Sequence, residues 1–121
     1  DYFGPTDFLQ MDAHRPPGGM VHDTPDSPES QLVGGPIQEN PDRVARANPI
    51  TYVTAGAPPF LIVHGDRDPL VPHHQSVLLA TALEKAGVPV TFYTVEGGGH
   101  GGFEDPKVDE LTKAFLEEHL R

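Results

Sequence analysis

Hydrophobic residues gather in the second half of the chain, in runs of two different periods. Residues 60–64 form an apolar run between a proline and a glycine, which is typical of a strand buried on both faces of a parallel sheet. Residues 73–86 carry apolar side chains at helical spacing and end before a glycine. A β-rich run follows at 90–95, and Asp105 can cap a last helix. The order strand, helix, strand, helix predicts an α/β fold with a right-handed parallel crossover.

The first third of the chain has weak periodicity. Residues 4–36 are rich in proline, glycine and aspartate, which predicts irregular loop with short helical turns at most. Either Ser27 or Ser30 can start one such turn. Asn40, followed by a proline and an acid, has the chemistry of a helix start with a capping side chain. We therefore predict a short helix at about 41–47.

The predicted sheet is incomplete. Two parallel strands with helices leave an open apolar edge, so this half of the chain needs neighbouring strands. We expect those strands upstream, and residues 2–3 resemble the tail of one of them. The chain 1–121 is accordingly expected to be the C-terminal half of a single domain. Within it, 1–39 would form a loop-rich pocket region, and 40–121 would form the strand-helix-strand-helix unit.

Composition excludes several classes of function. The formal net charge is -10, with 8 Lys and Arg against 18 Asp and Glu, and no cluster of cations is present to bind nucleic acid or an anionic membrane surface. No apolar run approaches the roughly 20 residues of a membrane-spanning helix. The absence of cysteine excludes disulfides, thiolate catalysis and cysteine zinc sites, while it leaves the compartment open.

Two polar side chains stand where the predicted strands end in loops. Asp68 follows the first strand, and His100 follows the second strand after three glycines. The carboxyl ends of parallel strands are where α/β enzymes keep residues that meet substrate. In a Ser-His-acid hydrolase the histidine moves the nucleophile's proton, and the acid orients the imidazole. The order acid then histidine, one strand-helix-strand unit apart, predicts two members of such a triad.

The segments around these two residues resemble a known family. PPFLIVHGDRDPLVP and VEGGGHGGF, together with DYFGPTDF, are similar to the C-terminal part of α/β-hydrolase carboxylesterases, in a bacterial lipase-like group that includes feruloyl and acetyl esterases. The similarity runs along nearly the whole chain. It implies a mostly parallel sheet flanked by helices, Asp68 as catalytic acid and His100 as catalytic histidine. It also implies a small ester as substrate, with no cofactor and no metal.

The serine nucleophile of that family is missing from the sequence. Its three serines, Ser27, Ser30 and Ser76, lack the flanking glycines of a G-x-S-x-G elbow. We expect caps or exposed loop residues at the first two and a helix residue at the third. In the family the elbow precedes a segment like DYFGPTDF, so we expect the nucleophile upstream. The 121 residues alone should therefore not hydrolyse esters.

We expect mainly structural roles for the remaining acid near these loops and for the other histidines. Asp66 is a rival acid, but it is expected to cap its loop. Histidines also occur at a strand end, at a helix start and in the first third of the chain: His64, His73, His74, His14 and His22. The first is expected to be a satisfied structural residue. The side chains of the adjacent His73 and His74 should diverge on a helix and share no metal. For His14 and His22, lining of the substrate pocket is the less favoured alternative.

Three functions remain open. The leading hypothesis is the C-terminal half of a serine carboxylesterase, in which Asp68 orients His100 as base and acid for an upstream serine. The second is a non-catalytic module that self-associates, with strand exchange through the apolar edge that the missing half would cover. The third is part of a serine peptidase of the same superfamily, because the HGxxDxxVP segment does not select the bond that is cleaved.

Overall fold

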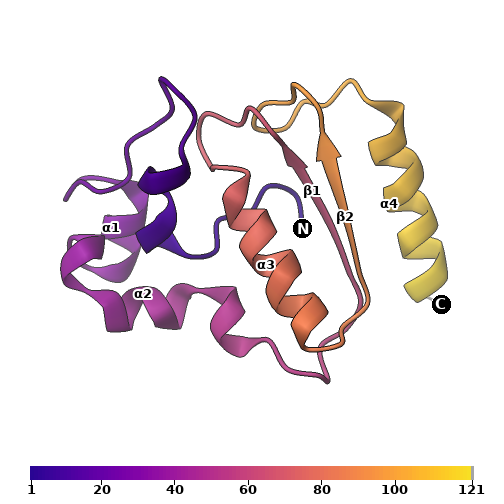
Figure 1. Cartoon of the computed structure of the whole chain (residues 1–121), viewed down its shortest axis with the longest axis horizontal. Helices are drawn as coiled ribbons and strands as arrows, with labels where there is room; N and C mark the ends of the chain where they lie inside the picture. The colour runs from indigo at the N-terminus through magenta and orange to yellow at the C-terminus, as the bar shows by residue number, and fades with distance from the viewer. Residues whose placement is uncertain (121) are drawn as a thin grey trace.

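A two-stranded parallel sheet lies between two long helices (Figure 1), in a computed structural model that describes residues 1–120. β1 (Phe60–Gly65) and β2 (Val90–Val95) pair in parallel over their whole length. α3 (His74–Lys85) joins them across one face of the sheet, and α4 (Pro106–His119) covers the other. The predicted α/β order and both predicted strands are therefore confirmed, and the helix bounds agree with the predicted ones to one residue at α3.

Alternate residues of β1 face opposite helices, which is why residues 61–65 of the strand are buried. Ile62 packs with Leu79 and Leu83 of α3. Leu61 belongs to the opposite core cluster, with Val108 of α4. Burying aliphatic side chains of this size stabilises the fold by roughly 1.5 to 3 kcal/mol each. The two faces of β1 thus pack against both helices. This packing also fixes the position of the loop that follows the strand.

The outer edge of β1 pairs with residues 1–3 through an isolated parallel bridge. Tyr2 forms a parallel bridge with Val63, and the N–H of Phe3 donates to the Val63 carbonyl over 2.8 Å. Residues 2–3 therefore pair with β1 through this isolated bridge, and their place at the end of a longer strand stays a prediction. Beyond it, Tyr2, Phe60 and Leu116 help line an apolar depression of about 290 Å³. The sheet is open in the part of the chain described, and the self-association hypothesis rests on this edge.

The first half of the chain consists of short helices joined by loops. Ser27 caps α1 (Pro28–Val33) by accepting a hydrogen bond from a backbone N–H of the first turn. α2 (Pro41–Ala47) has the predicted bounds, but the predicted cap is wrong, because the Asn40 side chain donates to the carbonyl of Pro36 over 2.8 Å instead. Four 3-10 turns complete this half: Phe8–Gln10, Asp12–His14, Ile37–Glu39 and Pro49–Tyr52.

A separate small core holds these short helices together. It consists of buried side chains from the 3-10 turns and their junction, from α2 and from the loop after β1: Phe8, Met11, Ile37, Val44 and Val71. α2 therefore packs with the first third of the chain, while the division into 1–39 and 40–121 stays a prediction. Over residues 1–120, every helix is too short or too polar to cross a membrane.

Candidate active site

The structure brings the two predicted site residues together at the carboxyl ends of β1 and β2. His100 Nδ1 lies 2.8 Å from Oδ2 of Asp68 in a hydrogen bond. The Asp68 side chain is fully buried, whereas 31% of the imidazole surface of His100 is exposed. With Nδ1 bound to the acid, Nε2 is the imidazole nitrogen that remains for a further partner. The structure thus shows a partly exposed imidazole held by a buried acid.

A turn of backbone amides and a second histidine surround the carboxylate of Asp68. Oδ1 accepts the N–H groups of Leu70, over 2.8 Å, and of Val71, over 2.9 Å. Oδ2 receives His100 and also lies 3.2 Å from Nε2 of His64. Each carboxylate oxygen is thus held from two sides by donors, so the orientation of the acid is fixed by the turn itself.

His64, at the end of β1, is fully buried and its two nitrogens have different partners. Nε2 lies 2.8 Å from the carbonyl of Val71, and Nδ1 lies 2.6 Å from Oγ of Ser76 on α3. Because a carbonyl only accepts, this network assigns the proton to Nε2, and the Ser76 hydroxyl donates to Nδ1. Burial lowers the pKa of His64, against the opposing effects of Val71 and Asp68. His64 is therefore a satisfied neutral residue, as expected, that donates toward the acid.

The two loops also contact each other through their backbones. Oδ1 of Asp66 accepts the N–H of Gly97 over 2.7 Å, so this acid caps the histidine loop, whereas it was expected to cap its own. The N–H of Arg67 donates to the carbonyl of Gly98 over 2.9 Å. Gly65 permits this approach, because a Cβ there would collide with the backbone of the histidine loop. The loop of His100 is thereby seated directly on the loop of Asp68.

The adjacent histidines at the start of α3 diverge, as expected. His73 Nε2 lies 2.9 Å from Oγ1 of Thr94 on β2. His74 turns the other way and stacks on His14, with ring centroids 3.5 Å apart. Burial lowers the pKa of both adjacent histidines. Within residues 1–120, no group of three or more histidines, cysteines or acids is arranged to hold a metal ion.

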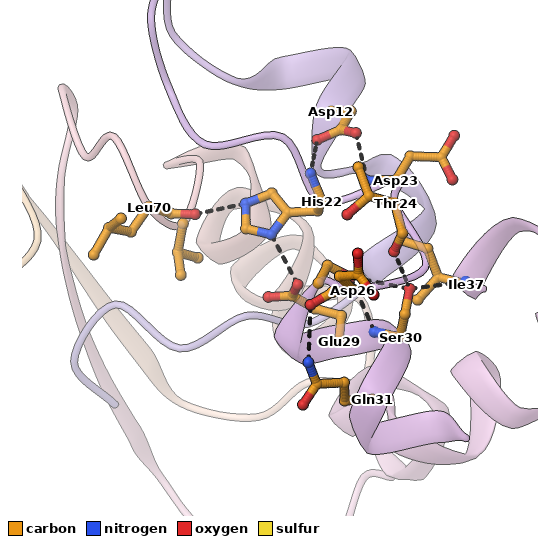
Figure 2. Close-up of polar contacts among 12 residues, drawn as sticks. Asp12, His22, Asp23, Thr24, Asp26, Glu29, Ser30, Gln31, Ile37 and Leu70 are labelled. Carbon is orange, nitrogen blue, oxygen red and sulfur yellow. Dashed lines mark hydrogen bonds and ion pairs between the residues drawn. The ribbon is translucent and has the colours of Figure 1, made fainter. Parts of the chain in front are cut away.

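His22 braces the acid loop from the first third of the chain (Figure 2). Its Nε2 lies 2.7 Å from the carbonyl of Leu70, two residues after Asp68, and its Nδ1 lies 2.9 Å from a Glu29 carboxylate oxygen. The backbone N–H of His22 donates to Asp12 over 2.7 Å. His22 is buried and acts on the backbone, so its role was not apparent from the sequence, in which it stands 48 residues from Leu70.

Each of the three serines has a structural partner. Ser27 caps α1, and the Ser30 hydroxyl donates to the carbonyl of Thr24 over 2.7 Å. Ser76 donates to His64 and is fully buried. Ser27 is a cap and Ser76 is a helix residue, as expected, whereas the expectation of a cap or an exposed loop residue is wrong for Ser30, which is buried within α1. The sequence signal for Ser76 was present but indirect, since it lies on the inner face of an amphipathic helix that follows His64.

Known proteins resemble the chain over most of its length. The BD-FAE family model matches residues 1–83. Esterase LipQ of Mycobacterium tuberculosis (strain ATCC 25618 / H37Rv) is 39% identical over 66 residues, which are 54% of this chain and 16% of LipQ. A structure described as a truncated form of carbohydrate esterase from gut microbiota has a TM-score of 0.85 at 36% identity, over 100% of this chain and 42% of that one.

A second solved structure agrees with the first. It is a bifunctional GH43-CE protein of Bacteroides eggerthii, with a TM-score of 0.81 at 34% identity, over 98% of this chain and 16% of that one. The chain thus spans less than half the length of each of these three relatives.

Proposed function

Because the chain belongs to the BD-FAE family of α/β-hydrolases, we propose that it is the C-terminal part of a serine carboxylic-ester hydrolase. The observation that carries the proposal is the hydrogen bond between Nδ1 of His100 and the buried Asp68. An acid and a histidine in this order, at the carboxyl ends of neighbouring parallel strands, are two of the three parts of such a site. The serine is supplied by residues that precede Asp1 in the full-length protein.

His100 carries the proton transfers in this mechanism. Its Nε2 takes the proton of the serine hydroxyl as the serine oxygen attacks the ester carbonyl. The resulting imidazolium gives that proton to the departing alcohol, and the same nitrogen then activates the water that hydrolyses the acyl-enzyme. Asp68 keeps the Nδ1–H tautomer in place and stabilises the imidazolium between these steps. The partial exposure of His100 supports this role, because Nε2 must reach both serine and substrate.

Small carboxylic esters are the proposed substrates. The names of two relatives, an esterase and a carbohydrate esterase, support cleavage of an ester rather than an amide. Acetylated sugars and aryl acetates are accordingly the probes to use first.

The test is carried out on the full-length protein with p-nitrophenyl acetate, an acetylated xyloside and a p-nitroanilide. We expect hydrolysis of both esters, and His100→Ala should lower kcat about 10³-fold or more. His119→Ala, at the exposed end of α4, is the matched histidine control and should keep wild-type kcat. Undiminished ester hydrolysis by His100→Ala would falsify the assignment. A preference for the anilide would favour the peptidase alternative.

A further inference from the structure

Phe3 has an unusual backbone conformation. Its φ is +45°, and it is the one non-glycine residue with positive φ between residues 1 and 120. Bulky side chains disfavour this left-handed region, which glycine and asparagine enter more easily. Such conformations persist where the surrounding structure imposes them, and they concentrate at functional sites.

The chain is fixed on both sides of Phe3. Before it, the N–H of Phe3 donates to the carbonyl of Val63 over 2.8 Å, which ends the short parallel pairing with β1. After it, the N–H of Thr6 donates to Oε1 of Gln75 over 2.7 Å, and the Thr6 hydroxyl donates to the Gln75 carbonyl over 2.8 Å. Both residues of the second contact are fully buried. The backbone of Phe3 must therefore turn sharply between a strand and the start of α3.

This turn aims the Phe3 ring at the imidazole of His100. The two ring centroids are 4.3 Å apart, with the planes inclined at 53°. On its other side, the same ring meets Phe103 edge to face, at 5.9 Å and 70°. A Cβ at Gly101 would lie 3.1 Å from Phe3 ring atoms, so the glycine next to His100 leaves the ring its place. Phe3 thus fills the space between the histidine loop and the end of β1.

We propose that Phe3 is a positioning residue for His100, an inference that rests on the proposed function. The bond to Asp68 fixes one atom of the imidazole, but it leaves the ring able to swing about that point. The glycines around His100 offer no side chains to stop this swing. The phenyl ring, held by its left-handed backbone, does so and keeps Nε2 directed at the serine. A displacement of about 1 Å at such a group can reduce turnover about 10²-fold.

The experiment compares Phe3→Asn with Phe3→Tyr in the full-length protein, with p-nitrophenyl acetate as substrate. Asn tolerates the positive φ but has no ring, whereas Tyr keeps the ring. We expect Phe3→Asn to lower kcat about 10-fold to 100-fold with KM within about twofold, and Phe3→Tyr to keep kcat within about threefold. The thermal midpoint of Phe3→Asn should stay within about 4 °C of the wild type, because relief of the backbone strain offsets the lost ring contacts. Phe3→Gly replaces Phe3→Asn if that variant does not fold.

Three outcomes overturn the inference. They are wild-type kcat in Phe3→Asn, an equal loss of kcat in Phe3→Tyr, and a loss of kcat that tracks thermal unfolding in both variants, which would indicate a structural role alone. His100→Ala, measured beside them, separates the two levels of the argument. If His100→Ala keeps its activity, the proposed function fails. If His100→Ala loses activity while Phe3→Asn does not, only the role of Phe3 fails.

Discussion

The two loops that meet in the candidate site are held by opposite means. The acid loop, residues 66–71, places Asp68 out of contact with solvent, with both of its carboxylate oxygens bonded to groups of the protein. The histidine loop, residues 97–103, contains five glycines, and it leaves 31% of the imidazole exposed. The conformation of the acid loop is fixed by hydrogen bonds within its own turn. The position of the histidine loop depends on its contacts with the acid loop.

This difference implies that, within the hydrogen-bonded pair, Asp68 contributes more to the stability of the fold than His100 does. The carboxylate of Asp68 accepts several buried hydrogen bonds, so this residue stabilises the fold as well as forming part of the candidate site. His100 makes one hydrogen bond to Asp68 and one ring contact with Phe3, so its removal costs fewer interactions than the removal of Asp68. An acid of this kind is preorganised by its own turn, whereas the orientation of the histidine depends on the side chains that it contacts.

The largest effect that tests this contrast is on stability. Asp68→Ala leaves the N–H groups of Leu70 and Val71 without their acceptor, and it takes a carboxylate away from the buried His64, whose Nε2–H keeps the carbonyl of Val71. We expect a loss of about 3 kcal/mol in the free energy of unfolding. His100→Ala should cost under about 1 kcal/mol. Urea unfolding of the full-length protein, followed by fluorescence or circular dichroism, measures both.

Both variants should be inactive, so activity does not distinguish them and the difference in stability carries the test. Asp109→Ala, an exposed acid on α4, controls for the loss of a carboxylate as such and should change stability by about 0.5 kcal/mol or less. Equal destabilisation by Asp68→Ala and His100→Ala would remove the contrast between the loops.

Local sequence patterns were sufficient to predict the framework. The apolar run of β1, the helical spacing of α3 and the capping chemistry of Asp105 at α4 are properties of neighbouring residues, and the structure contains all three. The pairing of Asp68 with His100 was also predictable, because parallel strands bring their carboxyl ends to one edge. The cap at α2 failed because the Asn40 side chain had a competing carbonyl close by.

The braces of the site were not predictable from the same patterns. His22 meets the acid loop across 48 residues, and Phe3 meets His100 from the far end of the chain. Ser76 donates to Nδ1 of His64 from a helix whose spacing shows only that the position faces inward. Such contacts depend on how separate elements come together, and no local period records them. Side chains that support a site from a distance are therefore the last to be recognised in a sequence.

A pH dependence of stability is the next effect in size. Burial lowers the pKa of His64 below its ordinary value of 6.5, so the folded protein holds it neutral at a pH where the unfolded chain begins to bind a proton. Stability is then full above pH 6.5 and falls as the pH drops from there toward the folded pKa, with a slope of up to about 1.4 kcal/mol per pH unit. Urea midpoints between pH 7.5 and 5.5 measure this slope.

His64→Asn is the comparison variant, since it removes the titrating group at this position. His74, whose pKa is lowered in the same direction, remains in both proteins. His73 also remains, but the part of the lowering of its pKa that comes from His64 is lost in the variant, which makes the slope of the variant shallower still. Asp68 and His100 face His64 and also remain. The variant should therefore show a shallower loss of stability on acidification, whatever its stability at pH 7.5. An identical slope would mean that the acid loop does not hold His64 neutral.

The smallest predicted effect concerns the backbone of the histidine loop itself. Gly97 and Gly99 both have open space where a Cβ would stand, but Gly97 has a φ of +72° and Gly99 has no positive φ. Gly99→Ala should therefore stabilise the protein by about 0.5 kcal/mol, because it restricts the unfolded chain without strain. Gly97→Ala should destabilise it by about 1 kcal/mol, because alanine disfavours the left-handed region. Thermal unfolding of both variants measures the two signs.

The opposite signs are what make this pair informative about the two loops. If the histidine loop is a flexible segment that packs on a rigid acid loop, the effect of each substitution depends on the local backbone conformation. Gly99→Ala then raises the stability of the protein, and Gly97→Ala lowers it. Gly99→Ala should also keep kcat within about threefold, because its methyl group meets no neighbour. Destabilisation by both alanines, or loss of turnover in Gly99→Ala, would instead mean that the glycine loop is as tightly determined as the loop of Asp68.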